Sequence, residues 1–284
     1  MGDVTTTFQT QYKNNVEMEL QLHKNPLEAA VTVTSDASAE KIKIKDLIGN
    51  GDPQEDDERE GNTRWQRTPF EGVWLVKPNE LYYAEIIENS DQLSTAIDLQ
   101  GAATMNGASV VNRAKTRRIL EGIAGDRITG KTGTTTNSFP GSSIIPADEG
   151  AAVDTKMSTA KLIAANKFFA ENYVDTDMLQ KFMILTAEDN AALLGEVPAT
   201  SNDFKASFSA TIDANGNLRS MLGFTFIHLE LSNPKLGPVA ALYTDADSNR
   251  LNPFWVKPGV VANYWQALRT EVGKIPERDR KSVV

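Results

Sequence analysis

The residues that point most directly to chemistry are the octapeptide Gly125–Thr132, GDRITGKT, which matches the pattern G-x-x-x-x-G-K-[ST] in full. In nucleotide triphosphatases this pattern forms a glycine-rich loop that cradles phosphate groups. The corresponding activity here would be that of a nucleotide-binding hydrolase that uses Lys131 and Thr132.

The elements expected around this motif are in the wrong order for phosphate binding. A phosphate-binding loop needs a strand before it and a helix after it, because the helix N-terminus supplies amides and dipole to the phosphates. Here a helix is expected first, and the following GTTTNSFPG segment contains Pro140 and three consecutive threonines, which disfavour a helix start. The sequence favours a turn, and the nucleotide enzyme stays as an alternative. Its metal-binding aspartate would have to come from Phe182–Asp189 or Val239–Asp245, and neither segment fits closely.

Other catalytic groups are scarce. The chain has no cysteine, which excludes disulfides, thiolate nucleophiles and zinc sites built on sulfur. Its two histidines, His23 and His228, lie in no motif, so neither a Ser-His-Asp site nor a two-histidine metal site is indicated. We expect no cofactor, no metal and, apart from the nucleotide enzyme kept as an alternative, no enzyme activity.

Length and charge set further limits. The 284 residues, 40% of them hydrophobic, suffice for one large domain or two modest ones. A net charge of −9 argues against tight nucleic-acid binding and would suit a protein that sits beside nucleic acid without binding it strongly. No signal peptide and no membrane-spanning stretch is recognisable, so we expect a cytosolic chain without membrane contact.

The element that leads into the motif is a long helix predicted over Asp98–Gly125. Its apolar stripe is narrow and made mostly of small residues, which lets other backbone come close, so we expect a strut with other elements laid against it. The stripe consists of Leu99, Ala103, Gly107, Val110 and Ala114. The second half is basic, with Arg113, Lys115, Arg117 and Arg118 near the C-terminal end, where positive charge suits the helix dipole.

The chain begins with three recognisable segments, one helix and two strands. An amphipathic helix is predicted over Thr6–His23 and is ended by Pro26; its stripe is Phe8, Tyr12, Val16 and Leu20. This helix could cover its own domain or dock on another subunit. Strands are predicted around Val31 and Val33 and around Ile42 and Ile44.

An acidic run then separates two arms of a predicted hairpin. Asp52–Glu60 contains six carboxylates, among them Glu55, Asp56, Asp57 and Glu58, against the single Arg59. Such a run must be a solvated tip or a docking surface. The chain returns through Phe70–Val76 and Leu81–Asn89. Because an isolated two-stranded ribbon is marginal in water, we expect something outside it, such as a neighbouring subunit, to hold it.

The sequence predicts a mixed α/β region for the rest of the chain. A hairpin or turn plus loop is predicted for Thr129–Ser143, and a helix begins after Ser158 as N-cap, with Met157 and Leu162 as a hydrophobic staple, and ends near Asn172. The next predicted elements are a buried strand Lys181–Leu185 and a short helix from Thr186 to Gly195 opened by Glu188 and Asp189. They are followed by a strand-like run Leu222–Leu231 whose start Gly223 breaks, an aromatic and β-branched stretch Phe254–Trp265, and a basic tail Lys274–Lys281.

The order of these parts resembles the major capsid proteins of tailed bacteriophages with the Hong Kong phage capsid fold. The similar stretches are Asn112–Thr136, around the end of the long helix, then Lys181–Leu194 and Met221–Ile227. The resemblance of order covers nearly the whole chain, whereas the specific motifs cover a smaller part. In this light the phosphate-loop match is a coincidence inside a turn.

The resemblance implies an α+β fold divided into named parts. These would be an N-terminal arm (1–36), an extended hairpin loop (37–76), a peripheral domain (77–150) with a spine helix (98–122), an axial domain (151–244), and a C-terminal return to the peripheral domain (245–284). Because no long segment precedes the arm, a separate scaffold or none is expected.

The implied function is structural. Such proteins assemble in the host cytoplasm into pentamers and hexamers of an icosahedral shell, and the shell encloses packaged double-stranded DNA without reading its sequence. Partners would be other copies and scaffolding, portal and decoration proteins. A non-viral encapsulating shell, which shares the fold, is an alternative. We expect inter-subunit contacts at the N-terminal stripe, at the acidic tip, and at the basic helix residues, the tip of one subunit meeting the helix of the next.

Overall fold

The computed structural model describes residues 25–48, 70–85, 99–151, 153, 155–196, 209–266 and 269. Its helices are α3 (Leu99–Ala124), α4 (Thr159–Glu171), α5 (Ala187–Glu196) and α7 (Val239–Leu242), with 3-10 turns η2 (Glu28–Ala30), η3 (Gly141–Ser143), η4 (Pro234–Leu236) and η5 (Lys257–Gly259). Its strands are β1 (Thr32–Thr34), β2 (Lys41–Ile48), β3 (Phe70–Val76), β4 (Arg127–Thr129), β5 (Thr135–Asn137), β6 (Lys181–Leu185), β7 (Thr211–Ile212), β8 (Leu218–Met221), β9 (Phe224–His228), β10 (Phe254–Val256) and β11 (Val261–Asn263).

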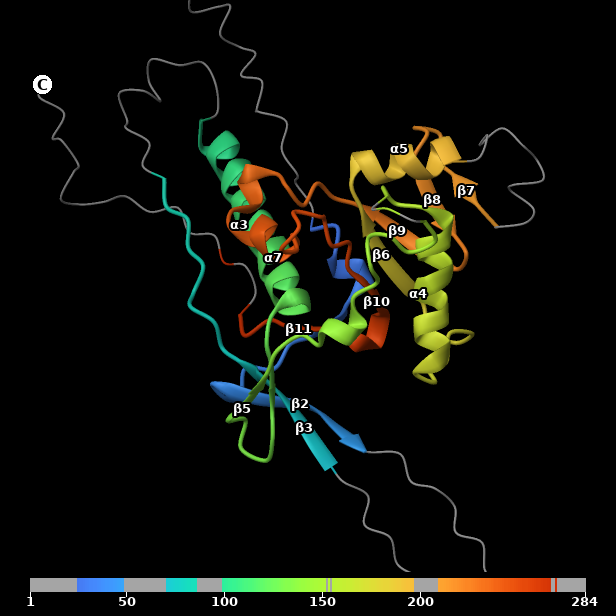
Figure 1. Ribbon diagram of the computed structural model, residues 1–284. Coiled ribbons are helices and arrows are strands. Elements are labelled where there is room, and N and C mark those ends of the chain that lie inside the picture. Colours follow the sequence, from blue (N-terminus) through green and yellow to red (C-terminus); the bar gives the residue numbers. More distant parts are fainter. Residues whose placement is uncertain are drawn as a thin grey trace, which may run out of the picture.

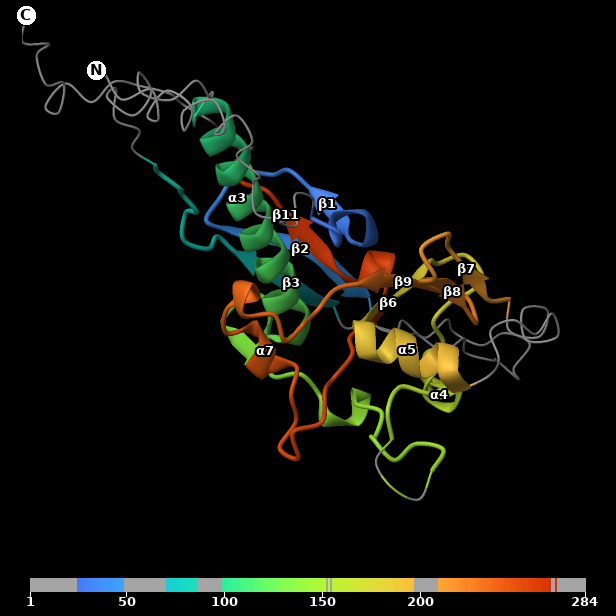
Figure 2. The ribbon, with the colours of Figure 1, turned by 90° about the horizontal axis from the view of Figure 1, so that it is seen from above.

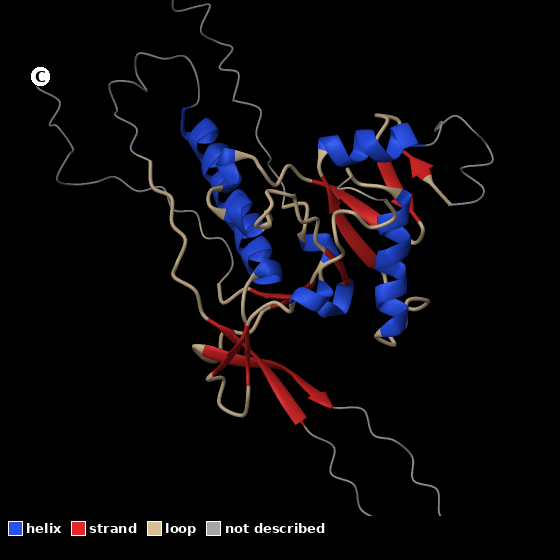
Figure 3. Ribbon diagram, viewed as in Figure 1, coloured by secondary structure: helices blue, strands red, loops and turns tan. Residues whose placement is uncertain are grey.

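A five-stranded mixed sheet lies between α3 on one side and α4 and α5 on the other (Figure 3). The strand order is β10-β6-β9-β8-β7, in which β6 and β9 run parallel and the other neighbours are antiparallel. Strand β6, KFMIL, is an almost unbroken apolar run, which is typical of a strand covered on both faces. The predicted strand Lys181–Leu185 is confirmed at both ends.

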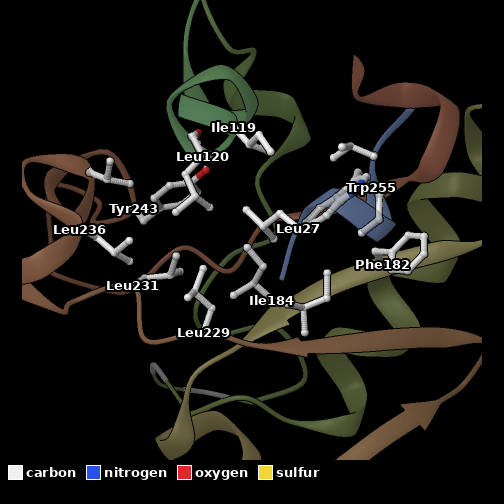
Figure 4. Packing of buried hydrophobic residues seen from close by; sticks show 14 residues of the cluster. Leu27, Ile119, Leu120, Phe182, Ile184, Leu229, Leu231, Leu236, Tyr243 and Trp255 are labelled. Atoms are coloured by element: carbon white, nitrogen blue, oxygen red, sulfur yellow. Dashed lines mark hydrogen bonds between the residues drawn. The ribbon is translucent and has the colours of Figure 1, made fainter. Parts of the chain in front are cut away.

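Two hydrophobic clusters cover the two faces of this sheet. Alternate residues of β6 belong to different clusters. Met183 and Leu185 pack with α4, α5 and β8 in the first cluster. Phe182 and Ile184 pack toward α3 and the start of the described chain in the second. In Figure 4 the side chains of Leu27, Leu120 and Ile184 converge from three separate segments into the second of these clusters. This cluster therefore joins elements that lie far apart in the sequence.

The long helix is confirmed, but its buried face is not the predicted one. Ala103, Gly107, Val110 and Ala114 are only partly buried, while the most buried described residues of α3 are Ser109, Thr116, Ile119 and Leu120. Thr116 follows Gly107 by two and a half turns at about 3.6 residues per turn, so it faces the opposite side. The hydroxyls of Ser109 and Thr116 donate to the carbonyls of Met105 and Asn112 in the preceding turn, which makes their burial inexpensive.

The predicted small-residue stripe still has a close neighbour. A side chain built on Gly107 would come within 3.1 Å of the Tyr83 ring, and the Tyr83 hydroxyl accepts a hydrogen bond from the side chain of Asn106. The chain before α3 thus lies against the helix at its glycine, as the sequence suggested for a strut.

The hairpin of β2 and β3 is held by its own chain. The two strands pair antiparallel from Lys41 opposite Val76 to Ile48 opposite Phe70, as predicted. However, β3 also pairs with β4, and β4 with β5, which gives a four-stranded sheet β2-β3-β4-β5. The expectation that something outside the ribbon holds it is therefore confirmed at its base, where the support is the hairpin after α3 and not a neighbouring subunit.

The beginning of the described chain is anchored by its end. Strand β1 pairs in parallel with β11, and the Trp255 indole donates to the carbonyl oxygen of Ala30. Leu27, Ala30 and Val31 are fully buried in the same cluster as Leu120. Figure 2 shows β1 and β11 side by side next to α3.

Of two local predictions, one is corrected and one is confirmed. Ser158 stands at the N-cap of α4 as predicted, but its side chain makes no capping bond; the Glu196 carboxylate accepts from the Thr159 amide and hydroxyl instead. The run Leu222–Leu231 contains strand β9, and Gly223 breaks the start of the run as predicted. Leu222 and Gly223 have φ values of 53° and 79° and form the tight turn between β8 and β9.

Candidate functional site

The Gly125–Thr132 motif lies between a helix and a hairpin. It begins where α3 ends, runs through β4, and finishes in the turn that leads to β5. In the described chain the next helical element is the three-residue η3, and α4 begins only at Thr159. Within the described chain no helix therefore begins directly after Lys131, and the prediction of a turn is confirmed.

The glycines of this motif have a steric explanation. Gly130 and the nearby Gly133 have φ values of 96° and 66°, a region that favours glycine. The indole of Trp74 in β3 donates to the carbonyl oxygen of Gly130 at 2.7 Å, and a side chain on Gly133 would lie 2.9 Å from the Trp74 ring. The turn closes over this tryptophan and ties the β2–β3 hairpin to the end of α3.

The four basic residues on α3 do not form one group that points away from the molecule. The Lys115 ammonium lies 5.0 Å from the centroid of the Tyr264 ring. Arg117 and Arg118 both approach Glu121, with nitrogen-to-oxygen distances of 3.9 and 3.4 Å. Arg113 also has an interaction partner. Because α3 continues to Ala124, its last turn contains no basic residue, and the predicted benefit from the helix dipole is lost.

The other predicted contact residues lie outside the described part of the chain. They are Phe8, Tyr12, Val16 and Leu20 of the N-terminal stripe, and Glu55, Asp56, Asp57 and Glu58 of the acidic tip. The predicted N-terminal helix, residues 86–89 and the basic tail also lie outside it. Contacts between subunits at all of these positions stay predictions.

Asp189 is the centre of a buried polar cluster, and the sequence indicates only one of its three side-chain partners. Its carboxylate accepts from the Thr186 hydroxyl at 2.7 Å, as the T-x-x-D spacing at the start of α5 suggests, and from the side chains of Arg250 and Asn252 at 3.2 and 2.9 Å. Nothing in the sequence pairs the last two with Asp189. Because its oxygens are occupied, this aspartate holds the loop before β10 and offers no free metal ligand.

Exposed ionic contacts surround that cluster. Glu188 accepts a hydrogen bond from Lys156 at 2.8 Å and from Arg250 at 3.1 Å, and these bonds lower the pKa of its carboxyl.

On the other face of the sheet, burial raises the pKa of the Tyr243 hydroxyl, which donates to the Leu120 carbonyl oxygen of α3. Tyr243 therefore links the chain after α7 to α3, much as Asp189 links α5 to the loop before β10.

The described residues offer little other chemistry. Among them no group of three or more histidine, aspartate or glutamate side chains could hold a metal ion. His228 places Nε2 2.9 Å from the Leu218 carbonyl oxygen, so it is engaged within the β8–β9 hairpin. None of the helices among these residues has both the length and the apolar character needed to span a membrane.

Comparison with protein families decides the identity of the chain. A family model described as phage capsid protein matches residues 4–284. The chain belongs to this phage capsid protein family. No curated protein matches this capsid protein significantly.

Solved structures of low sequence identity share the fold of the capsid protein. The capsid structure of the cyanophage P-SCSP1u matches with a TM-score of 0.57 and 12% identity, covering 87% of this chain and 77% of that one. The asymmetric unit of the bacteriophage PhiM1 mature capsid matches with a TM-score of 0.53 and 12% identity, and the match covers 83% of this chain and 72% of that one. The capsid of Ralstonia phage GP4 matches with a TM-score of 0.54 and 11% identity, and the match covers 77% of this chain and 72% of that one.

These matches confirm the resemblance found in the sequence. The fold is the mixed α/β fold of phage capsid proteins, and the chain is a major capsid protein that forms a shell and resides in the virion. Its role is structural.

Replacing Gly133 by alanine should destabilise the subunit. The substitution forces a non-glycine residue to a φ of 66° and pushes a methyl group into the Trp74 ring, so we expect a loss of about 1–3 kcal/mol in urea unfolding. Gly141→Ala is the matched control, because no atom lies within 4 Å of the added carbon; its effect should stay below about 0.5 kcal/mol. Equal effects of the two variants would contradict the packing role.

Replacing Lys131 by alanine should change almost nothing. Its side chain is exposed, so stability should shift by less than about 0.5 kcal/mol, and calorimetry with magnesium-ATP should detect no binding to the original protein. Micromolar ATP affinity that is lost in Lys131→Ala would restore the nucleotide enzyme.

Proposed function

We propose that this capsid protein assembles into pentamers and hexamers that close an icosahedral shell around packaged double-stranded DNA. The observation that carries the proposal is the family match over residues 4–284, together with a fold shared with three phage capsid structures. Assembly would take place in the host cytoplasm, and portal, scaffolding or decoration proteins would be further partners. The net charge of −9 supports contact with DNA that is neither tight nor sequence-specific.

The arrangement of the described elements supports a division into working parts. Strands β6, β7, β8 and β9 with α4 and α5 would be the axial domain (151–244), with β10 added to their sheet from the return, and α3 would be the spine of the peripheral domain (77–150). The β2–β3 hairpin would be the base of the extended loop (37–76), preceded by the arm (1–36), and β10 and β11 would belong to the C-terminal return (245–284). The cluster that joins Leu27, Leu120 and Ile184 would hold these parts as one unit.

Two sets of contacts between subunits follow from charge and apolar pattern. The stripe Phe8, Tyr12, Val16 and Leu20 would dock on a neighbour, because apolar stripes without a cover mark contact sites. The acidic tip would approach the basic half of α3 in the next subunit. There Glu121 already shares Arg117 and Arg118, so an arriving carboxylate would compete with it.

Purified protein should form rings or closed shells. We expect light scattering at micromolar concentration to give masses far above the 31.1 kDa of one chain, and electron microscopy to show rings of subunits or shells. A sample that contains only monomers under assembly conditions would count against the proposal.

Reversing the charge of the acidic tip should slow assembly without unfolding the subunit. Each exposed pair contributes only about 0–1 kcal/mol, but opposed patches steer encounter and set register. The variant with Glu55, Asp56, Asp57 and Glu58 changed to lysine should assemble at least roughly tenfold more slowly at low salt. The difference should shrink as salt rises, because the screening length falls from about 10 Å at 0.1 M to about 3 Å at 1 M.

Two further variants test the specificity of that effect. Asp148→Lys with Glu149→Lys reverses exposed carboxylates elsewhere on the surface and should assemble at nearly the normal rate. Arg117→Glu with Arg118→Glu, combined with the tip variant, should partly restore assembly. A tip variant that assembles normally at low salt would mean that the tip is only a solvated loop.

A further inference from the structure

Residues 78–85, which follow β3, have a backbone edge that no other described residue pairs with. Residues 78–85 form no helix or strand, and their backbone groups make no hydrogen bond to the backbone of any other described residue. The segment runs beside α3, as Figures 1 and 2 both show, and Tyr83 touches the helix at Gly107. An extended backbone that lies on a helix with one free edge can accept an added strand.

The side chains on this edge are apolar and incompletely covered. Leu81 and Tyr83 are each 41% exposed, and Tyr82 is 91% exposed. Because successive side chains of an extended segment point to opposite sides, Leu81 and Tyr83 share the side that faces α3, while Tyr82 points away from it. A strand added at this edge would cover the first two.

A cavity lies at the beginning of the same edge. It has a volume of about 570 Å³ and is lined by Lys77, Pro78 and Glu80 on one side and by Ala39, Glu40 and Trp265 on the other. The Trp265 indole donates to the Ala39 carbonyl oxygen at 2.8 Å, which fixes this wall. The chain after Trp265 therefore starts at the cavity, next to residues 78–80.

The residues that follow Trp265 have the pattern of a strand with one apolar face. Leu268, Thr270 and Val272 alternate with Arg269 and Glu271. The N-terminal segment, by contrast, repeats its apolar residues every fourth position, which suits a helix. Since the tail is tethered at the cavity, its effective concentration at the edge is about millimolar, whereas a free segment would have to be supplied from solution.

We propose that the tail of the same chain, from Leu268 to Val272, lies along Leu81–Glu85 as a parallel strand. The direction follows from the geometry, because the tail starts beside residues 78–80 and residues 81–85 lead away from that point. Leu268, Thr270 and Val272 lie on the side of Leu81 and Tyr83 against α3, and Arg269 and Glu271 lie on the side of Tyr82. The added strand closes the edge against unwanted pairing with other copies.

Cysteine crosslinking in the full chain tests this arrangement, since the protein contains no cysteine of its own. Tyr82→Cys is combined in turn with a cysteine at each position from 268 to 272, and a short thiol-to-thiol reagent is added. We expect crosslinks within one chain for Arg269→Cys or Glu271→Cys, and at least about tenfold less for the neighbouring positions 268, 270 and 272, because those face the opposite side. Tyr173→Cys, 93% exposed at the end of α4, replaces Tyr82→Cys as the control and should give none.

Each other outcome overturns the proposal. Crosslinks between two chains would assign the edge to the tail of a second copy, equal yields at all five positions would mean that the tail is not ordered there, and no crosslink would place it elsewhere. A chain shortened to end at Gln266 adds a second measurement: amide exchange in residues 81–85 should become at least about tenfold faster, while β6 stays protected as the control for folding. Both measurements concern one subunit and do not depend on shell assembly.

Discussion

Burial of strand β6 on both faces is the constraint on which the rest of the structure depends. A strand whose side chains are apolar in both directions needs two covering layers. One layer comes from nearby sequence, in α4 and α5, whereas the other is assembled from α3, the segment after Asn25 and the return through Trp255. The second cluster therefore brings both ends of the described chain to the same core. Leu27, Leu120 and Ile184, all fully buried, meet there although they belong to distant parts of the sequence.

A second link depends on one aromatic ring. Trp74 lies on β3 and reaches the turn after β4, where Gly130 accepts its hydrogen bond and Gly133 leaves room for its ring. The residue types that suggest phosphate binding are thus explained by backbone geometry and space, since glycine serves both needs. Only the order of the flanking elements separates the two explanations, and that order can be read from the sequence. The lysine and threonine of the motif are exposed at the turn and have no comparable structural explanation.

Local pattern predicted local structure well, and long-range contacts poorly. The bounds of β6, the start of α4 and the hairpin pairing of β2 with β3 follow from periodicity and turn residues. The buried face of α3 was predicted wrongly because Ser109 and Thr116 count as polar, although their hydroxyls are satisfied within the helix. Arg117 and Arg118 could have been paired with Glu121 by their spacings of four and three residues. The contact of Lys115 with Tyr264 and that of Arg250 with Asp189 join distant segments and leave no local signal.

The weakness of the charge pairs on α3 bears on how subunits would join. Arg118 and Glu121 are both substantially exposed, so their pair contributes at most about 1 kcal/mol to the subunit. Exchange of Glu121 for a carboxylate of a neighbour would then be nearly neutral for folding, and the same charges could guide association without first destabilising the subunit. A shell built from many such contacts can correct a misplaced subunit, because each contact breaks easily while their sum does not. The links at Trp74, at Asp189 and in the core around Leu120 lie within the chain, so they would keep the shape of the subunit constant if such exchanges took place.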